Sequence, residues 1–364
     1  EVMNAAFESS SDRWASDYPV LYGALKDGSC PHLVAEEDGE ILGSLGIYPD
    51  VVRIGSSRLK NGGIGAVSTI PEARGRGIMG ALLKETNQQM VRNGVDISLL
   101  GGARLRYARY GWEPVGYARH LSISAKNLRE GGVKPSSVRR CRGNDVKAVQ
   151  AVYETVAWGS DRPVREFLGR IERGGSHVYC SGQDHSFVYA AVHTQGDSAS
   201  IHELLGDAGC AAGFLLGLMK RLRVDRVSVR LPDFAHPMRE TLFPFATGHH
   251  QTPVRQLQIV NLPSLLTKVG DSLRTKAAQA KWRGSICFGI PERDQYVTLR
   301  RDTRGNFGVE PGRTSPCLEL IWGEAARLVF GGLPGEFDHL RSGPFDLLRE
   351  VFPLEWFFYP ADCV

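Results

Sequence analysis

The sequence lacks any hydrophobic run long enough to cross a membrane. The longest apolar run, residues 210–219, is about half as long as the roughly 20 residues that a transmembrane helix needs. The chain also lacks a large charge surplus, because 44 basic side chains against 40 acidic ones leave a net charge of +4. We therefore expect neither a membrane nor a nucleic-acid partner from charge or hydropathy.

Closely spaced cysteines are absent as well. The seven cysteines are widely scattered, never form a C-x-x-C pair, and no pair of cysteines or histidines has zinc-ligand spacing. We therefore expect no metal site and reduced thiols, as in a cytoplasmic protein. The chain opens at Glu1 without the charged and apolar segments of a secretory signal. This also favours a cytoplasmic location.

The length and composition are those of a globular protein with more than one domain. At 364 residues, 42% hydrophobic and 23% charged, the chain exceeds the usual 100–200 residues of one domain. Two or three domains are expected.

A βαβ unit is predicted in the first third of the chain. Residues 33–48 read as a hairpin around Asp38-Gly39, since apolar runs flank an Asp-Gly turn. A strand over 64–70 ends at Pro71, and apolar residues at helical spacing then run from Gly77 to Gly94. A strand over 95–100 and a short arginine-rich helix over 103–110 follow.

The same order of elements returns later in the chain. Residues 136–248 repeat strand, turn and helix, which indicates an internal duplication. The second copy carries the acidic turn 206–209 where the first copy has arginines. Beyond Pro253 the pattern changes to short strands around a helical stretch, 263–280, which indicates a third, α+β domain; the strands are predicted at 256–260, 286–290, 296–300 and 318–322.

The turn after Pro71 carries the clearest functional signal. The first amides of a helix lack intrahelical acceptors, and the helix dipole favours an anion there, so this glycine-rich start can wrap a phosphate. Arg74 and Arg76 add positive charge beside Gly75 and Gly77. The turn has neither the Gly-Lys of a Walker A loop nor a G-x-G-x-x-G fingerprint. A plainer alternative is that it only caps a surface helix.

The surrounding residues resemble motif A of the GNAT superfamily of acetyl-CoA-dependent N-acetyltransferases. The superfamily signature is met at Arg74 and Gly77 and departs at Met79. Val-Ser-Thr at 67–69, the R-G-R-G-I-M turn and Tyr-Ala-Arg-Tyr-Gly-Trp at 107–112 are similar to the enhanced intracellular survival (Eis) type. Residues 62–112 carry this likeness motif by motif, and the rest matches only in the order of elements.

The resemblance implies a fold of mixed α/β and α+β class. Tandem GNAT-like domains, each a mixed central sheet with flanking helices, precede an α+β domain like sterol carrier proteins. The expected boundaries are 1–128 for the acetyltransferase domain, 136–250 for a GNAT-like domain without a working cofactor loop, and 253–364 for the third. Measured against a GNAT domain, the first strand is missing before Glu1.

The resemblance also implies which residues bind acetyl-CoA. The strand backbone at 67–69 pairs with the pantetheine arm and polarises the thioester carbonyl, the glycine turn binds the pyrophosphate, and residues after the next strand line the cofactor. The residues so implied are Val67, Ser68, Thr69, Arg74, Gly75, Arg76, Gly77, Ile78, Met79, Gly80, Gly102 and Ala103. No metal is implied.

Two residues, Tyr107 and Val364, are implied as catalytic. Tyr107 matches the family tyrosine that protonates the departing sulfur, and Tyr110 is its rival, although the family usually has phenylalanine there. The base is implied to be the carboxylate of the chain terminus, here Val364, although the ending differs from the family's usual tail. The aromatic residues Phe7, Trp14, Tyr18 and Tyr22 stand where the family places helices around the acceptor, or they pack in the core.

The expected activity is acetyl transfer to a primary amine, either an aminoglycoside-like polyamine or a protein lysine. The family is hexameric, which implies a homo-oligomer. One alternative is a non-catalytic acyl-CoA or lipid binder with a vestigial site. Another, nucleic-acid binding through arginine stretches, is weakened by the near-neutral charge.

Overall fold

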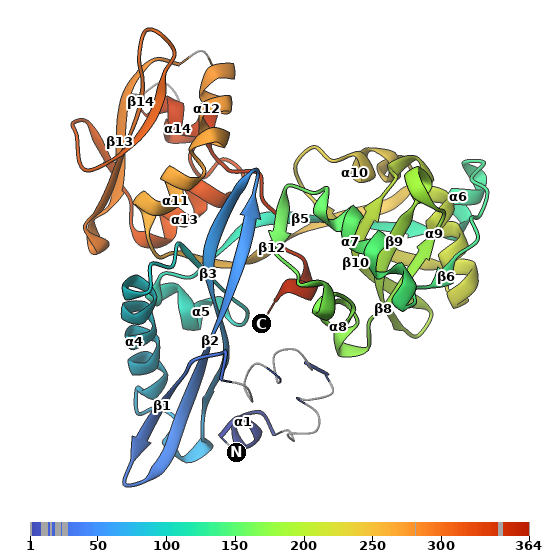
Figure 1. Ribbon diagram of the computed structural model, residues 1–364, viewed down its shortest axis with the longest axis horizontal. Coiled ribbons are helices and arrows are strands. Elements are labelled where there is room, and N and C mark those ends of the chain that lie inside the picture. The colour runs from blue at the N-terminus through green and yellow to red at the C-terminus, as the bar shows by residue number, and fades with distance from the viewer. Residues whose placement is uncertain are drawn as a thin grey trace.

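The computed structural model describes residues 2–8, 14, 17–18, 23, 28–280, 282–340 and 345–363 (Figure 1). Among these residues the strands form one long mixed sheet and one four-stranded sheet. No helix in the described ranges is both long and apolar enough to cross a bilayer.

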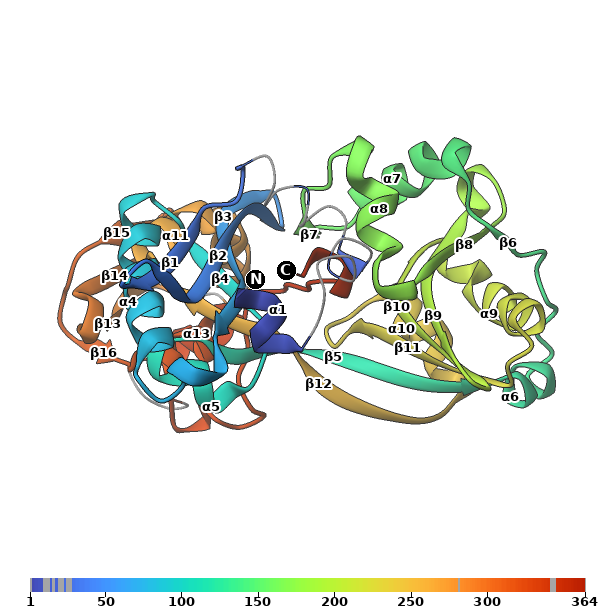
Figure 2. The same cartoon turned by 90° about the horizontal axis from the view of Figure 1, so that it is seen from below.

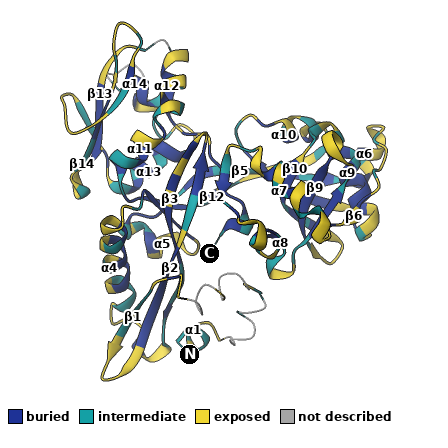
Figure 3. Cartoon of the chain, in the orientation of Figure 1, coloured by how far each residue is buried: buried dark blue, intermediate teal, exposed yellow. Residues whose placement is uncertain are grey.

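The N-terminal part of the long sheet follows the local sequence signals. The predicted hairpin is confirmed and forms β1 (His32–Glu37) and β2 (Glu40–Ile54), with Asp38 and Gly39 in its exposed turn (Figure 3). The predicted βαβ unit is also confirmed, because β3 and β4 pair in parallel around a helix. The unit consists of β3 (Ser57–Thr69), α4 (Ile78–Arg92) and β4 (Ile97–Leu100). The other elements of this part are α1 (Val2–Phe7), α5 (Arg104–Tyr107) and β5 (Glu113–Ser124).

The middle of the chain repeats this arrangement. A hairpin of β9 and β10 leads into α9 and then into β11, which pairs in parallel with β10. The elements are α6 (Ala125–Glu130), β6 (Arg139–Arg140), α7 (Val146–Glu154), β7 (Trp158–Ser160), α8 (Phe167–Ile171), β8 (His177–Ser181), β9 (Val188–Gln195), β10 (Ser198–Gly206), α9 (Ala208–Leu222), β11 (Arg226–Pro232), α10 (Pro237–Leu242) and β12 (Ala246–Ile259).

Two long strands join these halves into one sheet. β5 and β12 lie antiparallel along almost their whole length and span the molecule between the halves (Figure 2). One end of β5 pairs with β11, and one end of β12 pairs with β4. The strand predicted at 256–260 is therefore the end of β12 and pairs with β4, not with the smaller sheet.

The smaller sheet has the order β15-β14-β13-β16. Of the strands predicted for this region, the one at 318–322 is too long at its end, because Trp322 begins a helix. The elements are α11 (Leu262–Lys268), α12 (Gly270–Gln279), β13 (Gly284–Ile290), β14 (Gln295–Arg301), β15 (Phe307–Pro311), β16 (Cys317–Glu319), α13 (Trp322–Phe330) and α14 (Asp346–Val351).

The end of the chain returns to the centre of the molecule. Residues 354–359 are largely buried, and the chain end lies between the two halves of the long sheet (Figures 1 and 2). Arg230 of β11 donates to the carbonyl oxygen of Phe358 at 3.0 Å. Arg173 donates to the carbonyl oxygens of Pro360 and Cys363. The tail is thereby placed beside the site described below.

Candidate functional site

The turn between β3 and α4 presents an open helix N-terminus. Gly75 and Gly77 have φ of 83° and 80°, and a Cβ added at either would meet no atom within 4 Å. Gly77 is the N-cap of α4, and no side chain donates or accepts a capping hydrogen bond there. The first amides of a 15-residue helix therefore face open space, an arrangement that suits an anion.

These amides open into a cavity of about 1030 Å³, which we call the glycine-turn cavity. Nine of the predicted cofactor-binding residues contribute to its lining, together with both candidate tyrosines. Those nine residues are Val67, Ser68, Thr69, Arg74, Gly75, Gly77, Ile78, Met79 and Gly80. The structure thus brings together residues from β3, the turn, α4 and the region of α5.

The charge of this lining is strongly one-sided. Four cationic side chains contribute to it, Arg74, Lys84, Arg106 and Arg109, and within the described residues no aspartate or glutamate does. The predicted set of cofactor-binding residues does not include Lys84, Arg106 and Arg109. For Lys84 a signal was available, since it lies two helical turns after Gly77. A cavity lined in this way suits a ligand with several phosphate charges.

Arg76 differs from its neighbours in the turn. Its guanidinium lies 2.6 Å from a carboxylate oxygen of Glu37 in β1, with both side chains about half exposed, and it does not line the glycine-turn cavity. This contact lowers the pKa of Glu37 below its ordinary value. The Arg74 side chain lines the cavity and donates to the carbonyl oxygen of Ala6 at 3.2 Å.

A bulge lies near the end of β3. Ala66 has φ of 55°, and the pairing of β2 with β3 shifts register between Ser44 and Gly46. The pairing of β3 with β4 ends at Ile64 and Leu100, whereas β3 itself runs on to Thr69. Beyond the bulge, Ser68 and Thr69 remain paired with β2. The pairing with β4 has ended by then, and residues 67–69 line the cavity. Bulges of this kind are common next to active sites.

Tyr107, at the end of α5, lies where two cavities meet. It lines the glycine-turn cavity and also a second one of about 330 Å³, the aromatic cavity, which Gly102 and Ala103 also line. Tyr107 is 7% exposed, and its ring edge lies against Gly102. Its hydroxyl makes no hydrogen bond to any residue that the structure describes. Burial raises the pKa of Tyr107, so the phenol stays protonated at neutral pH.

Tyr110 has a different environment. Its hydroxyl lies over Gly80, so close that an added Cβ there would be 2.5 Å from the oxygen, and the Arg109 guanidinium lies 5.0 Å from the ring centroid. Tyr110 lines the glycine-turn cavity but not the aromatic cavity. The geometry therefore favours Tyr107 at the junction and gives Tyr110 a packing role against α4.

The aromatic cavity leads on towards the chain end. Its lining includes Phe7, Trp14 and Tyr18, whose rings contact each other in sequence at centroid distances of 5.6 and 6.1 Å. The predicted Tyr22 lies outside the described residues. Tyr18 and Tyr48 also line a third cavity of about 520 Å³, the tail cavity, to which Cys363 contributes. Val364, the predicted base, lies outside the described residues, directly after Cys363.

A protein-family model described as "Acetyltransferase (GNAT) domain" matches residues 5–115. This range contains the glycine turn, β3 and Tyr107. No curated protein sequence matches the chain.

Solved structures share the fold over nearly the whole length. A GCN5-related N-acetyltransferase from Kribbella flavida is 19% identical with a TM-score of 0.72, covering 98% of this chain and 94% of its own. One from Anabaena variabilis is 17% identical with a TM-score of 0.73, covering 100% and 96%. Eis1 from Mycobacterium abscessus is 15% identical with a TM-score of 0.58, covering 83% and 80%. At such identities these similarities concern the fold alone.

Proposed function

The chain carries a GNAT-type N-acetyltransferase domain, and we propose that this domain transfers the acetyl group of acetyl-CoA to a primary amine. The acceptor is an aminoglycoside-like polyamine or a protein lysine. The observation that carries the proposal is one cationic cavity that extends from the uncapped start of α4 to the hydroxyl-bearing ring of Tyr107.

The residues present fit acetyl-CoA. The amides of Gly75 to Gly80 and the cationic lining would hold the pyrophosphate, and the free β3 edge at 67–69 would hold the pantetheine arm. Gly102 and Ala103 line the adjoining cavity. When bound, acetyl-CoA supplies an activated acetyl group.

Residues of this chain then stabilise the developing charge and transfer the protons. The β3 backbone offers an amide to the carbonyl oxygen, which becomes more negative as the amine attacks. Tyr107 holds the proton that the sulfur takes on leaving, and its raised pKa keeps that proton in place. In this proposal the carboxylate of Val364 takes the proton of the acceptor ammonium group.

The decisive experiment mixes the protein with acetyl-CoA and a panel of amines and follows free thiol. Thiol release that depends on the amine is the expected result. Tight acetyl-CoA binding without such release would instead indicate a non-catalytic acyl-CoA binder. Salt-sensitive nucleic-acid binding without cofactor affinity would contradict the proposal as well.

Replacing Gly77 with Ala should weaken acetyl-CoA binding by roughly 10- to 100-fold. Alanine disfavours the φ of 80° at this position, so the helix amides that bond the pyrophosphate would be displaced. Charge-assisted hydrogen bonds of this kind are worth about 1.5–3 kcal/mol each. The measurement is calorimetric titration with acetyl-CoA. Gly132→Ala is a matched control, since Gly132 also has a positive φ, 76°, with open space at its Cβ. Equal acetyl-CoA affinities in both variants would contradict the assignment of the turn.

Deleting Val364 moves the terminal carboxylate back by one residue, to Cys363. If the carboxylate of Val364 is the base, this displacement should lower turnover by about 100- to 10,000-fold, the range of general-base effects. Val364→Ala keeps the chain length and the terminal carboxylate and should retain activity. Steady-state rates with a fixed amine measure both variants. Full activity after the deletion would remove Val364 from the mechanism.

The proposal extends to the architecture around this domain. The repeated strand order of the middle region supports a second GNAT-like domain. Its turn carries Asp207, whose carboxylate accepts from the Gly209 amide at 3.0 Å and so occupies the start of α9. The same proposal includes an Eis-type relationship, a sterol-carrier-like third domain, a homo-oligomeric state such as a hexamer, and a cytoplasmic location.

A further inference from the structure

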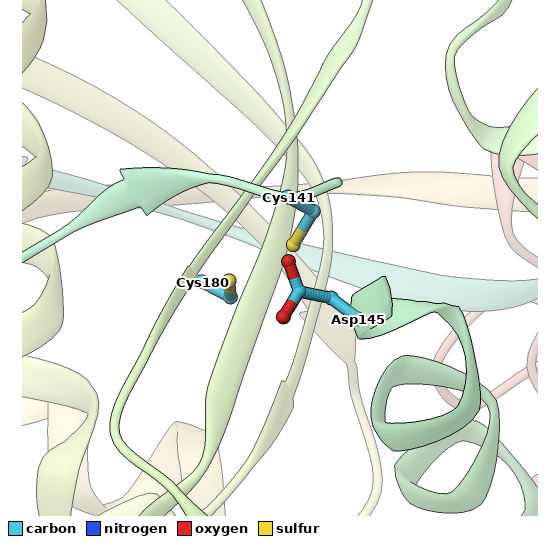
Figure 4. A group of neighbouring side chains, drawn as sticks. All are labelled: Cys141, Asp145 and Cys180. Atoms are coloured by element: carbon cyan, nitrogen blue, oxygen red, sulfur yellow. The ribbon is translucent and has the colours of Figure 1, made fainter. Parts of the chain in front are cut away.

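A cluster of two cysteines and one aspartate lies at the far edge of the long sheet. Cys141 directly follows the edge strand β6, Cys180 lies in β8, and Asp145 precedes α7. Figure 4 shows the three side chains converging, with the sulfur of Cys141 close to the carboxylate of Asp145. Their ligand atoms all lie within 4.8 Å of one another.

Strand pairing explains why residues 39 positions apart in the chain meet here. Arg139 of β6 lies opposite Cys180 of β8, and the Cys141 amide donates to the carbonyl oxygen of Val178 at 2.8 Å. Residues two apart in a strand share a face, so Arg139, Cys141 and Cys180 lie on one face of the sheet. Asp145 approaches that face from the turn before α7.

The carboxylate of Asp145 is held in a fixed orientation. Its two oxygens accept from the Arg139 guanidinium at 2.6 and 2.7 Å, and one accepts from the Arg142 amide at 2.8 Å. A carboxylate oxygen has more than one lone pair, so these bonds leave capacity for a further partner. An oriented carboxylate with its own hydrogen-bond donors is typical of metal ligands.

The burial of the cluster is graded. Cys180 is 0% and Cys141 8% exposed, whereas the Asp145 side chain is 14% exposed and connects the cluster to solvent.

Two sulfurs and one oxygen form a donor set that suits a borderline-soft divalent ion. In a tetrahedral zinc site such donor atoms are about 3.5–4 Å apart, as bond lengths of roughly 2.3 Å to sulfur and 2.0 Å to oxygen require.

We propose that Cys141, Cys180 and Asp145 bind one Zn²⁺ ion, with water in the fourth position. Both thiols lose their protons to solvent as the Zn–S bonds form. The two thiolates and the carboxylate then carry three negative charges, which the Zn²⁺ ion and Arg139 neutralise. The ion would tie β6, β8 and the start of α7 together at a sheet edge.

This site is independent of acetyl transfer. None of its three residues lines the glycine-turn, aromatic or tail cavity. The expectation of no metal came from spacing along the chain, and only the β6–β8 pairing brings these ligands together. Failure of one proposal would leave the other intact.

The test uses the full chain, reduced and stripped of metal, titrated with Co²⁺ as a spectroscopic substitute for Zn²⁺. We expect one Co²⁺ per chain, thiolate-to-metal charge-transfer absorption and the intense visible bands of tetrahedral coordination, all displaced by Zn²⁺. Absence of the charge-transfer absorption in the reduced protein would overturn the proposal. Because this readout uses the unaltered sequence, it does not depend on whether a variant folds.

Variants then locate the site. Cys180→Ser should weaken Zn²⁺ binding by at least about 100-fold, since even outer-shell changes cost 10- to 100-fold. The matched control is Cys287→Ser, because Cys287 also has a cysteine neighbour, Cys317, with the sulfurs 2.6 Å apart on paired strands. Unchanged Zn²⁺ affinity in Cys180→Ser, or an equal loss in Cys287→Ser, would overturn the assignment.

Discussion

Replacing Tyr107 with phenylalanine is expected to lower turnover by about 100- to 10,000-fold, the range of general acid catalysis. The change removes only the hydroxyl, so the ring still packs against Gly102 and the lining of both cavities is otherwise kept. The dissociation constant of acetyl-CoA should change little, because the cationic residues around the glycine turn remain. Thiol-release kinetics and calorimetric titration measure the two quantities separately.

The pH dependence gives a second readout of the same residue. Tyr107 acts in its protonated form, so activity that depends on it is lost as the pH rises through its pKa. Burial raises this pKa, which moves the loss to a higher pH than for an ordinary phenol near 10. The unaltered enzyme should therefore show no decline from this group between pH 7 and about 9.

Tyr110→Phe is the matched control for this prediction. Tyr110 lies three residues further on and lines the glycine-turn cavity, but its hydroxyl lies over Gly80 and away from the cavity junction. We expect a change in turnover of less than about fivefold, in line with a packing role. Equal turnover of Tyr107→Phe and the unaltered enzyme, or a larger loss in Tyr110→Phe, would remove Tyr107 as the proton donor.

The parts of the site that depend on local signals could be predicted from the sequence. The turn at Asp38-Gly39, the helix start at Gly77 and the stop near Gly94 each follow from residues within a few positions. The predicted cofactor-binding residues 67–69 and 74–80 lie close together in the chain, and for that reason most of them line one cavity.

Features that depend on distant pairing could not be predicted in the same way. The end of β12 pairs with β4, more than 150 residues earlier, and nothing in its own sequence specifies that partner. The bulge at Ala66 could not be predicted from the local sequence, because alanine is not a residue that indicates a bulge or a turn. The meeting of Cys141 with Cys180 likewise depends on the register of β6 and β8.

Buried charge is the clearest case of a feature hidden from the sequence. Arginine is mostly exposed in proteins, so Arg162 has no sequence signal for its position in the core. Its side chain is 0% exposed and lies 2.7 Å from Glu203 and 2.6 Å from Asp362. The tyrosine hydroxyls of Tyr189 and Tyr153 donate to the same two carboxylates at 2.6 and 3.2 Å. This network fixes the chain tail beside the tail cavity.

Arg162→Met should therefore lower the free energy of unfolding by about 3–5 kcal/mol, because it leaves two buried carboxylates without their cation. Chemical denaturation measures this loss. Arg165→Met is the matched control, since the Arg165 side chain is 86% exposed and lies 3.4 Å from Glu166, and surface pairs are worth at most about 1 kcal/mol.

The same variant tests how the tail is held. Asp362 contacts Arg162 directly and is followed by Cys363, which lines the tail cavity. Loss of Arg162 should therefore speed hydrogen exchange of the amides of residues 362 and 363, which donate within the tail to the carbonyl oxygens of Tyr359 and Pro360. If Arg162→Met costs no more stability than Arg165→Met, and the tail amides exchange at an unchanged rate, the buried ion network does not anchor the tail, and a base delivered by that tail loses its structural support.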